Sequence, residues 1–138
     1  MEPTDAPTIR VAPILRTILL LAAIHSFATG VGLIVQPVPI LEWAGWGTIE
    51  QHFFPAQGGV FHILMALLYM LAYRSASVRG MLMPFIILVK TVAAVFLLLY
   101  YTAVEPIWMV LASALTDGLF AAVFLYLFLR SRSPVPRI

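Results

Sequence analysis

The stretch MLMPFIILVKTVAAVFLLLYY, residues 81–101, decides the fold of this chain. Lys90 is its one charged residue, and its neighbours are mostly apolar. A run of roughly 17–25 such residues is long enough to cross the hydrocarbon of a bilayer as a helix. Because lipid gives exposed backbone groups no hydrogen-bond partner, the run should be helical. The stretch therefore predicts a membrane-spanning helix with a cation near its middle.

Three further apolar runs have the same character. The four predicted spans cover residues 14–35, 56–74, 81–103 and 106–130. A proline stands ahead of each run or near its start, where a missing N–H removes no helical bond: Pro13, Pro55, Pro84 and Pro106. The composition, 62% hydrophobic and 10% charged, is typical of a polytopic membrane protein. We therefore predict an all-α integral membrane protein, with residues 1–138 forming one antiparallel four-helix bundle.

The arginines predict how the bundle is oriented. They stand before the first span, between the second and third, and after the fourth: Arg10, Arg16, Arg74, Arg79, Arg130, Arg132 and Arg137. Cytoplasmic segments of membrane proteins carry such an excess of Lys and Arg. Both tails, residues 1–12 and 131–138, are therefore expected in the cytoplasm, and the chain is expected to be a multi-pass protein of the inner (plasma) membrane. The tryptophans stand at the opposite ends of the spans, as in an aromatic belt at the outer interface: Trp43, Trp46 and Trp108.

The N-terminus also has an alternative interpretation as a cleaved signal peptide. Arg10 and Arg16 precede a short apolar stretch, and residues 26–28 resemble a small-x-small cleavage site. The apolar run nevertheless continues through Val35. That length favours a membrane span over a cleaved segment.

The first outer connection, residues 36–56, is unusually apolar for a solvated loop. Residues 40–44 can form one or two helical turns lying in the membrane interface. We therefore predict a short interfacial helix, or lid, over the bundle. The alternative is a surface loop anchored by tryptophan.

One ionisable residue lies deep in each predicted span: His25, His62, Lys90 and Asp117. At about 1.5 Å per residue, their depths from the cytoplasmic ends are roughly 14–20 Å, which puts all four in one layer near the bilayer centre. Counted from a turn at Val104, Lys90 and Asp117 are nearly equidistant, so the two should face each other if both point inward. A charge at the middle of a membrane helix costs about 2.5–3.5 kcal/mol, which makes such residues candidates for a functional site.

The faces around this layer are small or polar. The predicted stripes are Ala22, His25, Thr29 and Gly32 on the first helix, and Gly58, His62, Ala66, Tyr69 and Tyr73 on the second. We therefore predict a shared polar pocket, with Thr29 and Tyr69 as further binding residues. The alternative is structural. In that case Lys90 and Asp117 form an ion pair that fixes helix register, and the histidines make hydrogen bonds between helices.

A second polar group stands at the outer mouth of the second helix. It consists of Glu50, His52 and Gln57. These residues can admit protons or bind a polar head group. The alternative is that they are solvated loop residues.

Two segments resemble a known family. Residues 30–37, GVGLIVQP, close the first span, and residues 54–61, FPAQGGVF, open the second. In these segments and in its architecture, the chain resembles the small four-helix bacterial membrane proteins grouped as BphX-like and DoxX-like. Many members carry an arginine near the start of the second helix, where this chain has Gln57. The resemblance implies a compact four-helix membrane protein, and it carries no catalytic residue over to this chain.

Three functions fit the pattern. In the first, the polar layer binds a proton or a small amphipathic molecule for transport or a membrane-associated process, with His25 and His62 carrying protons near neutral pH. Four helices are few for a complete transporter, so a homo-oligomer or a larger complex is expected. In the second, the histidines bind haem b or a quinone in a redox subunit. In the third, the chain is a non-catalytic assembly subunit.

Several other functions lose support. The chain has no cysteine, which excludes disulfides, thiolate nucleophiles and sulfur-ligated metal sites. No Ser-His-Asp order, HExxH or paired-carboxylate motif is present, so a hydrolase is disfavoured. The net charge of +2 comes mostly from arginines at membrane edges, which gives nucleic-acid binding no support. We therefore predict no metal and no resident cofactor, and leave the question of enzymatic activity open.

Overall fold

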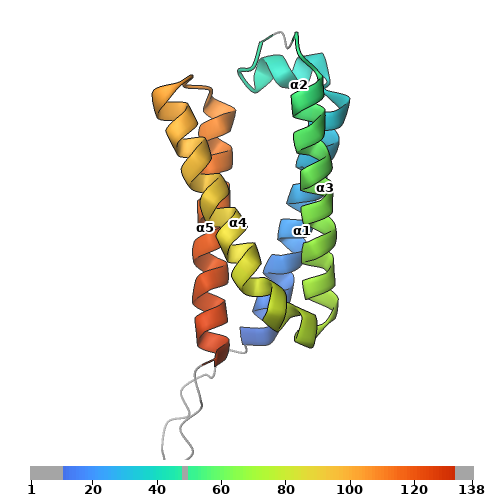
Figure 1. The fold of residues 1–138 in the computed structure, drawn as a ribbon, viewed down its shortest axis with the longest axis vertical. Helices are drawn as coiled ribbons and strands as arrows, with labels where there is room; N and C mark the ends of the chain where they lie inside the picture. The colour runs from blue at the N-terminus through green and yellow to red at the C-terminus, as the bar shows by residue number, and fades with distance from the viewer. Residues whose placement is uncertain (1–10, 48–49, 133–138) are drawn as a thin grey trace, which may run out of the picture.

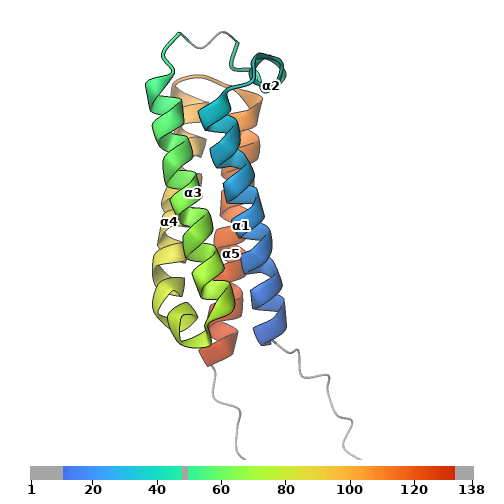
Figure 2. The same cartoon turned by 90° about the vertical axis from the view of Figure 1, so that its right-hand side faces the viewer.

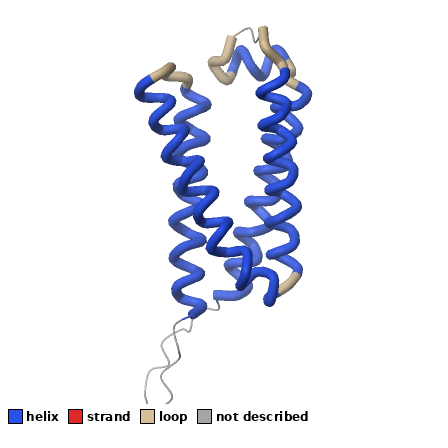
Figure 3. The backbone as a smooth tube through the Cα atoms, in the orientation of Figure 1, coloured by secondary structure: helices blue, strands red, loops and turns tan. Residues whose placement is uncertain are grey.

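The computed structural model describes residues 11–47 and 50–132, and this part of the chain is helices joined by short loops, with no strand (Figure 3). The helices are α1 (Val11–Val35), α2 (Val38–Trp43), α3 (Phe53–Arg74), α4 (Ala76–Ala103) and α5 (Trp108–Arg132). Four of them, α1, α3, α4 and α5, are long and apolar enough to cross a membrane. The all-helical class predicted from the sequence is confirmed, and the four long helices are compatible with a multi-pass membrane protein.

Helices α1, α3 and α4 begin before the predicted spans, whereas α5 begins and ends two residues later than predicted. Helix α4 begins at Ala76 because Ser75, in an extended conformation, accepts a hydrogen bond at Oγ from the N–H of Val78 (3.3 Å). Ser is among the preferred residues at this capping position. The position predicted for Pro84, near a helix start, was wrong: α4 begins at Ala76, so Pro84 lies inside the helix, where it lacks the N–H of a regular helical bond. Because α3 ends at Arg74 and α4 begins at Ala76, only Ser75 lies between the two helices.

The long helices pack as two pairs, α1 with α3 and α4 with α5. Each helix also contacts one helix of the other pair, since α1 meets α5 and α3 meets α4. The start of α1 and the end of α5 lie at the same end of the molecule (Figures 1 and 2). The two pairs come together at this end and separate towards the end that carries α2 (Figure 1).

The hydrophobic core lies in the half of the molecule where the pairs meet. Its fully or almost fully buried members are Leu15, Leu19, Ala22 and Ala23 of α1, Tyr69 and Ala72 of α3, Met83 and Ile86 of α4, and Phe124 and Leu127 of α5. All four long helices thus contribute to one cluster. This cluster holds the two pairs together.

Beyond the core, α1 and α3 touch through glycine. A Cβ built on Gly30 would lie 2.8 Å from the carbonyl oxygen of Gly59, and one on Gly59 would lie 2.6 Å from the carbonyl oxygen of Gly30. Glycine allows this close backbone approach between helices. The predicted stripes named Gly32 and Gly58 instead. These two glycines do not make the close backbone contact, because a Cβ on Gly32 would meet nothing within 4 Å and one on Gly58 only Leu33 at 3.9 Å.

Helix α2 lies in the first connection, where the sequence predicts a short helix. Gln36 precedes it with a positive φ of 49°, which turns the chain sharply after α1. The Trp43 and Trp108 rings meet edge to face with centroids 4.7 Å apart, and the Trp108 Nε1–H donates to the carbonyl of Trp43 (2.9 Å). The connection that follows α1 is thereby attached to the first turn of α5, so it bridges the two helix pairs.

Candidate functional site

The centre of the candidate site is a buried pair of opposite charges on α4 and α5. The Lys90 ammonium group donates a hydrogen bond to Asp117 Oδ1 and forms an ion pair with it. The two residues are only 3% and 5% exposed. Both stand near the middle of long apolar helices, far from either end. A buried carboxylate and ammonium group in such surroundings persist as ions only when paired.

Two aromatic rings lie close to the ammonium group. Lys90 Nζ lies 5.8 Å from the ring centroid of Tyr69 on α3 and 5.4 Å from that of Phe120 on α5. A cation at this range is attracted by the negative face of a ring. Phe120 in turn stacks on Phe124 with centroids 5.8 Å apart, which fixes its position. Tyr69 therefore joins Lys90 and Asp117 in one cluster.

His25 on α1 reaches the same cluster through Phe120. The two rings lie 5.9 Å apart between centroids. Within the described part of the chain, His25 Nδ1 is buried and has no hydrogen-bond partner. Most buried polar atoms in native proteins are paired, so an unpaired ring nitrogen beside an ion pair is unusual. Thr29, one turn further along α1, donates its hydroxyl to the backbone carbonyl of His25 (2.9 Å) and so lies directly beside it.

His62 on α3 has a different local partner. Its Nδ1 lies 3.3 Å from the hydroxyl oxygen of Ser26 on α1, and the direction of this hydrogen bond depends on the tautomer. Ser26 is almost fully buried. His62 therefore belongs to the contact between α1 and α3, whereas His25 faces α5. Sequence reasoning did not single out Ser26, although it follows His25 directly.

The three outer-mouth residues have different surroundings in the structure. Glu50 and Gln57 are exposed. His52 instead pairs with Gln36: its Nδ1 lies 2.6 Å from Gln36 Oε1, and its carbonyl accepts from Gln36 Nε2 (3.0 Å). Gln36 is only 7% exposed. The sequence analysis placed Gln36 only in the segment that closes the first span.

An apolar groove runs along α4 beside the cluster. It has a volume of about 430 Å³, is open to the outside, and is lined by Leu88, Val89, Val92, Ala93 and Phe96. A smaller pocket of about 130 Å³ near α2 is lined by Leu33, Gln36, Leu41, Trp46 and Pro55. None of the four ionisable residues of the predicted layer lines either pocket. Three of them, His25, Lys90 and Asp117, are instead in a packed aromatic cluster.

Residues 11–47 and 50–132 contain no group of three or more His, Asp or Glu side chains able to hold a metal ion. Comparisons with protein families, curated proteins and solved structures found no match.

Proposed function

We propose that this chain is a multi-pass protein of the inner membrane whose polar layer binds a proton, or a small amphipathic molecule, for transport or a membrane-associated process. The observation that carries the proposal is the buried Lys90–Asp117 pair midway along two apolar helices. A membrane protein pays a high free energy to place charges at that depth. Retention of both charges is therefore best explained by a use for them.

The distribution of charge supports an orientation with both termini in the cytoplasm. The described arginines belong to the start of α1, the turn between α3 and α4, and the end of α5: Arg16, Arg74, Arg79, Arg130 and Arg132. These segments lie at one end of the molecule (Figure 1). The three tryptophans belong to the other end, at α2 and the start of α5. Positive charge marks the cytoplasmic side, and tryptophan is enriched at interfaces.

Asp117 is the proton-binding group in this proposal, and Lys90 is its counter-charge. When Asp117 takes up a proton, the Lys90 ammonium group loses its anionic partner, while the rings of Tyr69 and Phe120 continue to stabilise the cation. The unpaired Nδ1 of His25 offers a neighbouring place for a proton. Exchange of a proton between these groups makes the ion pair switchable.

Reconstitution into vesicles tests this function. The wild-type chain should bind or conduct protons in response to an imposed pH gradient, as followed by a dye trapped inside the vesicle. Lys90→Met and Asp117→Asn should abolish that response while the helical content seen by circular dichroism is retained. Glu42→Gln, a change to an exposed carboxylate on α2, is the control and should leave the response intact.

A second candidate is supported by the close packing around the pair. Neither pocket is lined by Lys90 or Asp117, as expected if the pair only fixes the register of α4 against α5. The chain would then be a non-catalytic subunit of a homo-oligomer or larger membrane complex. In that case a double replacement by matched apolar residues would keep the protein's activity and its assembly.

A further inference from the structure

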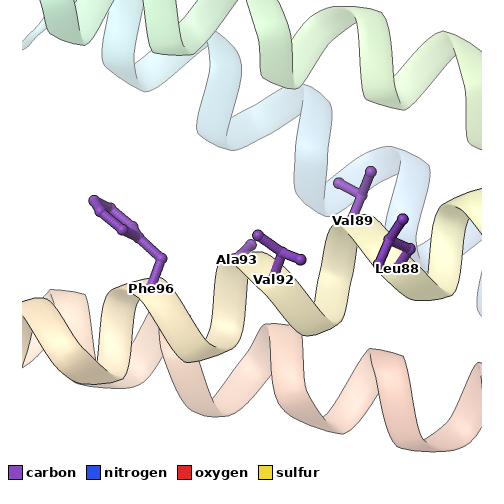
Figure 4. A pocket seen from close by; sticks show the side chains of 5 residues that line it. All are labelled: Leu88, Val89, Val92, Ala93 and Phe96. Atoms are coloured by element: carbon purple, nitrogen blue, oxygen red, sulfur yellow. The ribbon is translucent and has the colours of Figure 1, made fainter.

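The groove on α4 belongs to the space between the two helix pairs. Figure 4 shows its five lining side chains projecting from α4 towards the side of α1 and α3. Val89 and Ala93 are half-buried and form its inner wall, while Leu88, Val92 and Phe96 are exposed. All five are apolar, so the groove offers no hydrogen bond to water. A cavity lined in this way favours a hydrocarbon occupant.

The groove begins at the level where the closed core ends. The buried core residues of α4 are Met83 and Ile86, and Lys90 follows one turn later. Towards the α2 end, the helix pairs move apart (Figure 1). The ion pair thus lies beside the inner end of the groove, and Phe96 marks its outer end.

We propose that this groove is a binding site for one hydrocarbon chain of a membrane lipid from the leaflet at the α2 end. The groove extends from Leu88 to Phe96, about 12 Å at 1.5 Å per residue. One leaflet contributes about 15 Å of hydrocarbon, half of the roughly 30 Å of a bilayer. A chain reaching from that leaflet to the bilayer centre therefore matches the groove in length, position and polarity.

The bound chain has a consequence for the ion pair. It fills the open apolar space beside Val89, which precedes Lys90 in the chain, and keeps water out of that space. The proposal rests on the membrane-spanning arrangement described under the proposed function, but not on proton binding by the polar layer. Lipid binding and proton binding are separate measurements, so either can fail without the other.

Native mass spectrometry of the protein extracted from bacterial phospholipid membranes in mild detergent tests the site. Two valines of α4 give a matched comparison, because Val92 lines the groove and is 58% exposed, while Val95 lies outside it and is 53% exposed. Wild type and Val95→Trp should retain one phospholipid through detergent exchange. Val92→Trp should retain at least tenfold less, because the indole occupies the groove.

A second variant changes a residue of the inner wall of the groove. Ala93→Phe should also lower lipid retention at least tenfold, with circular dichroism and gel filtration checking that it is folded. Equal retention in Val92→Trp and Val95→Trp, or no retained lipid in the wild type, would overturn the proposal. So would a wild-type dimer that Val92→Trp converts to monomer, because a second copy would then cover the groove. If lipid retention follows the prediction while vesicles show no proton response, the lipid site stands and the proton function fails.

Discussion

The backbones of Gly30 and Gly59 touch: a Cβ on either residue would lie within 2.8 Å of the other's carbonyl oxygen. Such a distance cannot be accommodated by rotation of a side chain, because the obstacle is backbone. The contact therefore sets how closely α1 and α3 approach one another. It lies towards the α2 end, beyond the hydrophobic core.

Alanine at these glycines should force the two helices apart. We expect Gly30→Ala and Gly59→Ala each to lower the free energy of unfolding by about 1–3 kcal/mol, as overpacked cores do. Gly32→Ala is the matched control on α1, because a Cβ there meets nothing within 4 Å. Thermal unfolding in detergent, followed by circular dichroism, measures the difference. Equal midpoints for Gly30→Ala and Gly32→Ala would contradict the contact.

The link between Trp43 and Trp108 predicts the behaviour of α2. Trp108→Phe keeps an aromatic ring but removes the indole N–H that donates to the carbonyl of Trp43. A net contribution of about 0.5–1.5 kcal/mol is typical of one hydrogen bond. Hydrogen exchange should therefore speed up by up to about tenfold in a peptide covering α2. Trp46→Phe, outside this contact, should leave that rate unchanged, and equal rates in both variants would refute the link.

The pairing of Gln36 with His52 makes a prediction for the outer-mouth residues. His52→Ala leaves the buried Gln36 amide without its imidazole partner, at an expected cost of about 1–3 kcal/mol in stability. Gln57→Ala removes an exposed side chain and should change stability by no more than about 0.5 kcal/mol. Denaturation of both variants in the same detergent compares them. A larger loss of stability for Gln57→Ala than for His52→Ala would contradict the structural role of His52.

The ion pair should behave as a coupled unit in stability. Replacing only Asp117 by Leu leaves Lys90 buried without an anion, which we expect to cost about 3–5 kcal/mol. Lys90→Met should be similarly destabilising, and the double variant should recover most of the loss. A double-mutant cycle in detergent yields the coupling energy. Additive losses would mean that the two charges do not depend on one another.

Much of the fold follows from the sequence because lipid restricts the choices. A mostly apolar run as long as residues 81–101 is expected to cross lipid as a helix, and these residues are helical in the structure. Counting residues from Val104 puts Lys90 and Asp117 at one height, and their side chains touch in the structure. Depth is predictable in this way because every helix residue advances by about the same 1.5 Å.

Rotation about the helix axis is harder to obtain from sequence. Gly32 was assigned to the small and polar face of α1, whereas the close contact with α3 is made by Gly30, two residues earlier. Each residue turns by about 100° in a helix, so Gly30 and Gly32 lie on nearly opposite faces of α1. The pairing of Gln36 with His52 joins residues on two helix ends, and only the path of the connection brings them together. Likewise, the α4 groove depends on the separation of the two helix pairs, and the hydrophobic periodicity of the sequence does not predict that separation.

The redox alternative has a simple spectroscopic outcome. Haem b ligated by His25 and His62 would give the purified protein a Soret absorbance band. We expect no such band, because the polar layer is proposed to bind a proton or a small amphipathic molecule without a resident cofactor. A band that His62→Ala abolishes would instead establish the redox function.

Infrared difference spectroscopy across a pH titration tests the central claim most directly. If Asp117 is the proton-binding group, lowering the pH of the membrane-reconstituted protein should produce a carboxylic acid C=O band in addition to those of the other five acidic side chains. Asp117→Asn should remove that band, and Glu42→Gln should leave it. Persistence of the band in Asp117→Asn, or its absence from the wild type at every pH at which the protein is folded, would contradict proton binding by Asp117.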